Sequence, residues 1–183
     1  MYVEFIERDR SMPIEIFRQL GRQGSDWAED SADRLVLQLG RALRLGPAPS
    51  YLAFWEIPDI GRLDAWEEYF GSPAALLNRR SQAMHRAIHI QRAGVYDTLF
   101  GAAAVSHPLY YLEYYRSVPP GFTLGTDGLV YFLRRVGCLG PEAQGIAVWG
   151  CPSYREIEAL ARREGGPPPM DAGVYKDFGT ETL

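Results

Sequence analysis

The sequence predicts an α+β fold that is built from two tandem copies of one unit, because three segments recur in the same order along the 183 residues. Leu45-Gly46-Pro47, Ala53, Trp55 and Pro58 return 94 positions later as Leu139-Gly140-Pro141, Ala147, Trp149 and Pro152. Ala93-Gly94-Val95-Tyr96 returns as Ala172-Gly173-Val174-Tyr175, and Tyr2-Val3-Glu4-Phe5 resembles Tyr111-Leu112-Glu113-Tyr114. Ordered repeats of this kind indicate duplicated structural units. We therefore divide the chain into units 1–104 and 105–183.

The first unit begins with a predicted strand at 2–7, which is rich in residues that favour strands. A helix is predicted at 13–21, because apolar residues follow Pro13 at intervals of three. Leucines at odd positions from Leu35 to Leu45 predict a second strand. A helix through Leu35, Leu39 and Leu43 is the alternative interpretation of this last segment.

The rest of the unit is predicted from segments that both copies share. A turn at 46–50 leads to a strand at 51–57, and Asp59, like Ser153 in the second copy, is suited to cap a following helix. A last strand is predicted at 94–99, and its counterpart at 173–178. The repeat offset falls from 94 to 79 between these segments, so the second copy lacks 15 residues. The missing piece corresponds to an extra predicted helix near 73–89.

The resulting order is strand, helix, strand, strand, helix, strand, which is the ferredoxin-like βαββαβ unit. A sheet of this kind carries helices on one face, so its other apolar face needs a cover. Two tandem units can cover each other, and the sequence therefore predicts an intramolecular α/β barrel with a trimmed second unit. A homo-oligomer would cover the same surface, and this alternative stays open.

The segment Tyr51-Leu52-Ala53-Phe54-Trp55, followed by a helix with Arg62, Leu63 and Trp66, resembles the dimeric α/β-barrel superfamily. Within it, the chain is most similar to the NIPSNAP branch, in which a strand that ends in tryptophan precedes a helix that contains arginine. The resemblance implies a small-molecule protein, since the superfamily includes cofactor-free monooxygenases, isomerases, haem-degrading enzymes and members without a known reaction. It transfers no catalytic residue, because no full catalytic signature is present and a fold does not decide a function.

Composition excludes several classes of protein. Nineteen basic and twenty-three acidic side chains give a net charge of −4, which offers no field for nucleic acid. The longest uncharged stretch, 98–112, is too short to span a bilayer. Acidic residues near the N-terminus do not fit a secretory signal, and Cys138 and Cys151 do not form a Cys-x-x-Cys pair. We therefore expect reduced cysteines and a cytoplasmic protein.

Two glutamates and two histidines are the candidates for chemistry. Glu4 and Glu113 occupy the middle of the first strand of each copy, where a carboxylate without a partner has a raised pKa and can act as a general acid or base. Pairing with an arginine, or an outward orientation at a strand end, is the structural alternative. His85 and His89 share a face of the predicted extra helix, where they could exchange protons, bind a metal or haem, or simply form a polar flank.

Aromatic side chains on the predicted strands could line a pocket for an apolar or aromatic ligand, although they are equally typical of a sheet core. They are Tyr2, Trp55, Tyr96, Tyr111, Tyr115, Trp149 and Tyr175. No phosphate-binding glycine loop or serine-hydrolase motif occurs, and we expect no organic cofactor or metal. The sequence therefore predicts an enzyme that acts by proton transfer or oxygen insertion, as an isomerase, cyclase or monooxygenase. A non-catalytic binding or assembly module is the alternative.

Overall fold

The computed structural model describes residues 1–8, 33–46, 50–73, 88–102, 106–118, 127–164 and 167–177. These residues contain eight strands and two helices. The strands are β1 (Tyr2–Arg8), β2 (Arg34–Arg41), β3 (Tyr51–Glu56), β4 (Ile88–Gly101), β5 (Leu109–Tyr115), β6 (Leu129–Arg135), β7 (Gly145–Cys151) and β8 (Asp171–Asp177). The helices are α2 (Arg62–Gly71) and α5 (Tyr154–Ala161).

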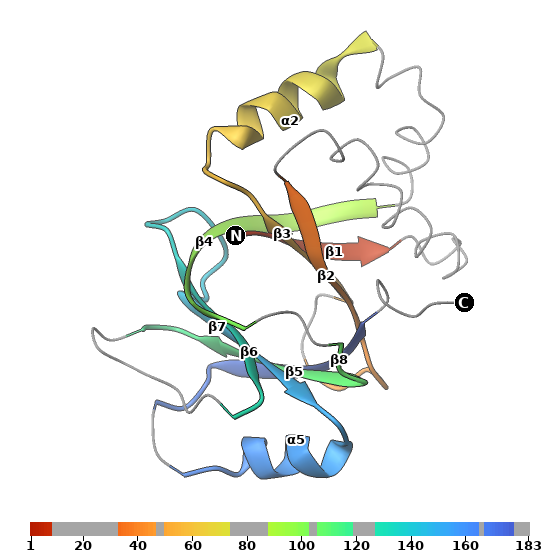
Figure 1. Cartoon of the computed structure of the whole chain (residues 1–183), viewed down its shortest axis with the longest axis vertical. Coiled ribbons are helices and arrows are strands. Elements are labelled where there is room, and N and C mark those ends of the chain that lie inside the picture. The colour runs from red at the N-terminus through yellow and green to blue at the C-terminus, as the bar shows by residue number, and fades with distance from the viewer. Residues whose placement is uncertain are drawn as a thin grey trace.

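The eight strands form one closed barrel in the order β1-β3-β2-β8-β5-β7-β6-β4 (Figure 1). Every neighbouring pair is antiparallel. The first four strands and the last four are joined at two junctions, β2 with β8 and β4 with β6. Hydrogen bonding at both junctions leaves no free sheet edge, which is the usual reason for a barrel to close.

The predicted fold class, two tandem ferredoxin-like βαββαβ units of the α+β class, is wrong. The described residues are mostly strand, and they hold two helices in a closed eight-stranded barrel. The terms alpha–beta barrel and ferredoxin-like are wrong for the same reason, because the structure is a β-barrel with few helices among its described residues. Two separate sheets that press against each other were expected, but the two sets of strands join edge to edge into one continuous sheet.

Predicted helices account for part of the error. The helix expected at 13–21 lies outside the described residues, as does most of the helix expected near 73–89. The end of that second helix is wrong, because β4 begins at Ile88 and contains His89. The two observed helices lie on opposite outer sides of the barrel, α2 over the first four strands and α5 over the last four (Figure 1).

The second strand is shorter than its leucine pattern predicted. β2 ends at Arg41, and a bulge between Leu35 and Leu37 breaks the alternation. Leu37 and Leu39 point into the core, whereas Leu43 lies in the following turn with a φ of 49° and 76% of its surface exposed. The leucines at alternate positions therefore continue beyond the end of the strand into a turn, and in the turn this spacing does not indicate burial.

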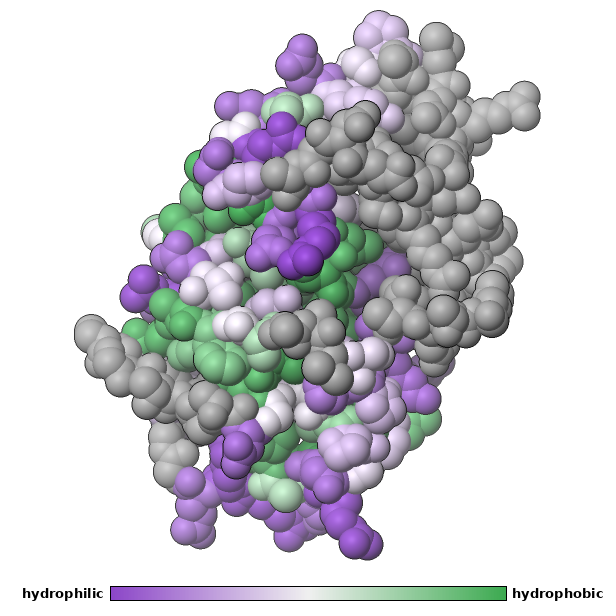
Figure 2. Space-filling view, in the orientation of Figure 1, coloured by the Kyte–Doolittle hydropathy of each residue, from purple (hydrophilic) through white to green (hydrophobic). Residues whose placement is uncertain are grey.

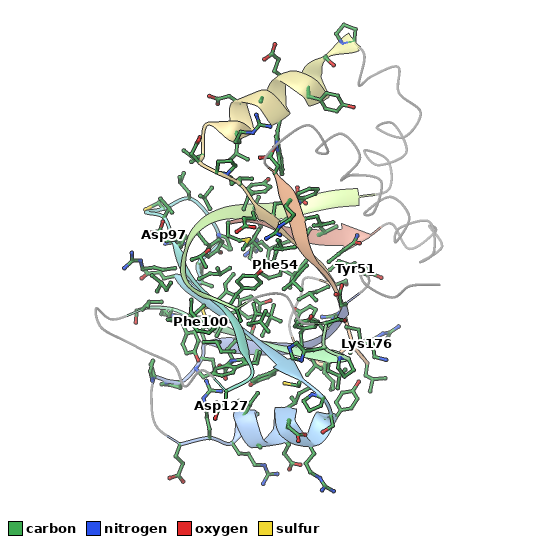
Figure 3. The ribbon with its side chains drawn as sticks, in the orientation of Figure 1. Tyr51, Phe54, Asp97, Phe100, Asp127 and Lys176 are labelled. Atoms are coloured by element: carbon green, nitrogen blue, oxygen red, sulfur yellow. The ribbon has the colours of Figure 1, made fainter. Side chains whose placement is uncertain are left out.

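Alternation along the strands separates an interior core from two outer clusters. The interior cluster fills the centre of the barrel, with Phe54 of β3 among its members (Figure 3). It consists of Val3, Phe5, Leu37, Leu39, Leu52, Phe54, Tyr96, Tyr110, Leu112, Tyr114, Val130, Tyr131, Leu133, Ala143, Ile146, Val148 and Tyr175, none more than 7% exposed. Removal of this apolar surface from water is the main stabilising term of the fold.

The outer clusters lie beneath the helices. Ile6, Ala53, Trp55, Ile57 and Trp66 pack together under α2, while a larger group that includes Trp149 and Ile157 packs under α5. Hydrophilic side chains gather over both helices, and apolar surface lies in the band between them (Figure 2). Each half of the barrel wall thus carries apolar side chains on both faces where a helix covers it.

The repeated sequence segments meet each other at the two junctions. Val174 of β8 donates its backbone N–H to the carbonyl of Leu45 at 3.2 Å, and Val95 of β4 donates to that of Leu139 at 2.9 Å. Gly46 has a φ of 95°, and an added Cβ would lie 2.3 Å from a backbone atom of β8. Glycine follows each of these leucines because the chain passes directly against the opposite strand.

Candidate functional site

Glu4 and Glu113 occupy equivalent positions on the outer face of the barrel wall, in β1 and β5. Glu4 is paired across the sheet with Ala53 on one side and with Ala93 on the other. Glu113 likewise lies between two alanines, Ala147 and Ala172. Because these alanine side chains are small, residues from neighbouring rows of the sheet and from the helices can pack over each carboxylate.

Each glutamate accepts a hydrogen bond from the tryptophan that the sequence repeat places on the next strand. Trp55 Nε1 donates to Glu4 Oε2 at 3.1 Å, and Trp149 Nε1 donates to Glu113 Oε2 at 3.0 Å. Both tryptophans are buried, at 7% and 3% exposure. The repeat therefore builds the same indole–carboxylate pair twice.

Glu113 is fully engaged by further donors. Arg163, just after α5, places its guanidinium 2.5 Å from Glu113 Oε2, and the Tyr115 hydroxyl donates to the same oxygen at 2.7 Å. The guanidinium also lies 4.8 Å from the ring centroid of Trp149. With its side chain 2% exposed, Glu113 is the structural ion pair that the sequence left as an alternative.

Glu4 has no such cation among the described residues. The arginine of the helix above it, Arg62, forms an ion pair with Asp33 at 2.8 Å, and its Nε also donates to that carboxylate. Trp66 donates to Asp33 as well, at 2.9 Å. The positive charge of α2 is thus committed to Asp33, and the indole of Trp55 remains the hydrogen-bond donor to Glu4.

The environment of Glu4 changes its ionisation. Burial raises the pKa of Glu4 from 4.5 to about 7, although the hydrogen bond from Trp55 partly opposes this shift by lowering the pKa. Burial also raises the pKa of the neighbouring Tyr2 hydroxyl, and the charge of Glu4 adds to that shift. A carboxyl group that titrates near neutral pH can both accept and donate a proton, as general acid–base catalysis requires.

The indole donor of Glu4 belongs to a cluster of three aromatic rings. The Trp66 ring centroid lies 5.2 Å from that of Trp55 and 5.3 Å from that of Tyr2, in edge-to-face contacts. Gln38 of β2 was not predicted from the sequence. It is paired with Ala53 on the same face and is 4% exposed, and its buried Oε1 has no hydrogen-bond partner among the described residues. The signal in the sequence was a single polar residue between two leucines that point into the core.

The other predicted site residues do not join this cluster. Tyr96 and Tyr175 belong to the interior core, whereas Tyr111, Tyr115 and Trp149 belong to the outer cluster under α5. His85 lies outside the described residues, and His89 lies in β4 with its side chain outside them. Of the predicted aromatic pocket, the structure brings Tyr2 and Trp55 together beside Glu4.

A separate cavity of about 620 Å³ opens at the end of the barrel where β1 begins. Its walls are formed by Met1, Arg34, Leu35, Val36, Glu56, Thr98, Gly101, Ala102 and Tyr131. Arg34 and Glu56 form an exposed ion pair at 2.5 Å on this wall. The cavity contains none of the sequence-predicted site residues.

Within the described ranges, no group of three or more His, Cys, Asp or Glu side chains is arranged to hold a metal ion. Cys138 and Cys151 are both free thiols. No helix in the described part of the chain is long and apolar enough to cross a membrane. Comparisons with protein-family models, with curated proteins and with solved structures find no significant match to this chain.

Proposed function

We propose that the protein is a small-molecule enzyme that needs no organic cofactor and moves a proton on an apolar or aromatic substrate, with Glu4 as the general acid–base group. The observation that carries this proposal is the contrast between the two repeated carboxylates. Glu113 is neutralised by Arg163, whereas Glu4 keeps its indole donor and, among the residues that the structure describes, has no cation beside it. If Glu4 had a purely structural role, a pairing with arginine like that of Glu113 in the second half would serve this role equally well.

The proposed reaction starts with Glu4 ionised. Its carboxylate removes a proton from an acidic C–H of the substrate, and the electron pair of that bond moves onto an adjacent carbonyl oxygen or ring to form an enolate. The resulting carboxylic acid then returns the proton to a different atom, so that the net change is an isomerisation. Tyr2, Trp55 and Trp66 pack together beside Glu4, and aromatic side chains of this kind suit contact with the planar ring of such a substrate.

A Kemp elimination tests the base directly. The substrate 5-nitrobenzisoxazole loses one C–H proton to a base, and its N–O bond breaks to give a coloured nitrophenolate. Wild-type protein should show kcat/KM that rises through about pH 7, the pKa of Glu4. Glu4→Gln should lower kcat/KM by at least about 100-fold. Glu142→Gln, which changes an exposed loop carboxylate, is the matched control. Equal rates for wild type and Glu4→Gln would overturn the proposal.

The second candidate is a non-catalytic binding module. It is favoured by the position of the 620 Å³ cavity, whose walls do not include Glu4, and by the packed interior of the barrel. In that case a ligand occupies the open end of the barrel and undergoes no reaction. Ligand binding that is weakened by Arg34→Met and unaffected by Glu4→Gln would support this alternative.

A further inference from the structure

Gln38 and Glu4 lie in one row across the outer face of the barrel wall. The register pairs Glu4 of β1 with Ala53 of β3, and pairs Ala53 with Gln38 of β2. Neighbouring strands are about 4.8 Å apart, so the two backbones lie about 10 Å from each other with a single methyl group between them. Since Leu37 and Leu39 point into the interior core, Gln38 projects from the same outer face as Glu4.

Gln38 carries an unsatisfied acceptor in this row. The residue is 4% exposed, and its Oε1 is buried without a hydrogen-bond partner in the part of the chain that the structure describes. An unpaired buried amide oxygen is destabilising, and an apolar side chain of similar shape would avoid that cost. Buried polar atoms are nearly always paired, so each exception calls for a specific reason such as a role in catalysis or binding.

The second half of the barrel supplies the comparison. The equivalent row there consists of Glu113, Ala147 and Phe132, so a phenyl ring replaces the amide. Phe132 packs edge-on against Tyr115, with ring centroids 6.3 Å apart. The half in which the glutamate is neutralised by arginine thus has an apolar residue at this position. The half in which the described residues place no cation beside the glutamate has the unpaired acceptor.

We infer that the amide oxygen of Gln38 accepts a hydrogen bond from the substrate on which Glu4 acts. This inference rests on the proposed function and names its substrate class. The substrate is a planar, mostly apolar molecule with an acidic C–H for Glu4 and a neutral N–H or O–H donor for Gln38, as in a lactam or a phenol. Both proposed contacts use acceptor oxygens, so a ligand that presents an anionic group to them is disfavoured.

Oxindole and N-methyloxindole provide a matched pair of probes. Both have an acidic CH₂ beside the lactam carbonyl, and they differ in the N–H donor. Exchange of the CH₂ hydrogens in D₂O is followed by proton NMR for each compound, and each rate is divided by the rate in acetate buffer to remove differences in intrinsic acidity. Wild-type protein should exchange oxindole about tenfold faster than N-methyloxindole after this correction, the equivalent of one hydrogen bond.

Gln38→Met tests whether this preference comes from the amide. Methionine is similar in length and apolar, so the corrected ratio should fall to about one, while exchange of N-methyloxindole is retained. Gln144→Met, at an exposed glutamine, should keep the wild-type ratio. A wild-type ratio of one, or a preference that survives Gln38→Met, would overturn the inference and leave the role of Glu4 intact. Exchange that is equally slow in wild type and Glu4→Gln overturns both.

Discussion

Replacement of Glu4 by glutamine is expected to stabilise the protein at neutral and alkaline pH. Glutamine keeps an acceptor for Trp55 Nε1 but cannot ionise. The folded state disfavours ionised Glu4, because burial raises its pKa from 4.5 to about 7. The protein therefore loses stability as the pH rises from about 4.5 to about 7, and above that range the wild type carries the cost of an ionised, partly buried carboxylate.

The size of this effect follows from the two pKa values. The difference between about 7 and 4.5 is converted at about 1.4 kcal/mol for each pH unit, which gives about 3 kcal/mol. This value is an upper limit, because Glu4 is only partly buried and solvent screens part of the interaction. Glu4→Gln should thus match the wild type near pH 4 and exceed its free energy of unfolding by up to about 3 kcal/mol near pH 8.

Urea unfolding monitored by tryptophan fluorescence measures this difference, with the free energy extrapolated linearly to water at each pH. Subtraction of the wild-type curve from the Glu4→Gln curve cancels the pH dependence that all other groups contribute. Glu142→Gln, at an exposed loop position, should give a flat difference. A difference for Glu4→Gln that does not change with pH, or that makes the variant less stable at about pH 8, would refute the account of its burial.

Three other substitutions test the surrounding structure, each by the same urea titration at about pH 7. Arg163→Met leaves Glu113 buried without its cation and should cost about 3–5 kcal/mol, whereas a loss below about 1 kcal/mol would show that the pair is solvated. Trp55→Ala should cost about 3–5 kcal/mol as a core deletion. Gly46→Ala should cost more than about 1 kcal/mol, because its φ is 95° and the new Cβ meets the β8 backbone; unchanged stability would mean that the junction can move apart.

Repeats in the sequence were the most informative feature for the fold. The segments around Trp55 and Trp149 lie on β3 and β7, and the Ala-Gly-Val-Tyr segments lie on β4 and β8. The strands at these repeated segments were therefore predictable, since the same pattern in two contexts reduces the ambiguity of each. The positions of Glu4 and Glu113 in the middle of their strands followed from the same reasoning.

Features that depend on long-range pairing were not predictable in this way. Closure of the barrel depends on hydrogen bonds between β2 and β8 and between β4 and β6, and no local pattern encodes which edges will meet. The segment around His89 has helical spacing, yet it extends β4 beside β1, where pairing overrides local preference. Gln38 escaped notice because its importance comes from its neighbours on β3 and β1, which are distant in the sequence.

The two halves also show that a repeated carboxylate does not by itself identify a reactive one. Glu4 and Glu113 share a strand position, an indole donor and alanine neighbours, so none of these features separates catalysis from structure. Arg163 is the feature that distinguishes them. Its guanidinium donates to Glu113 Oε2, as do the Tyr115 hydroxyl and the Trp149 indole, so this oxygen is not available to a ligand. A general base must instead change its protonation state near neutral pH at little cost. The proposed reaction is therefore to be sought in the first half of the barrel, where the described residues place no cation beside the glutamate.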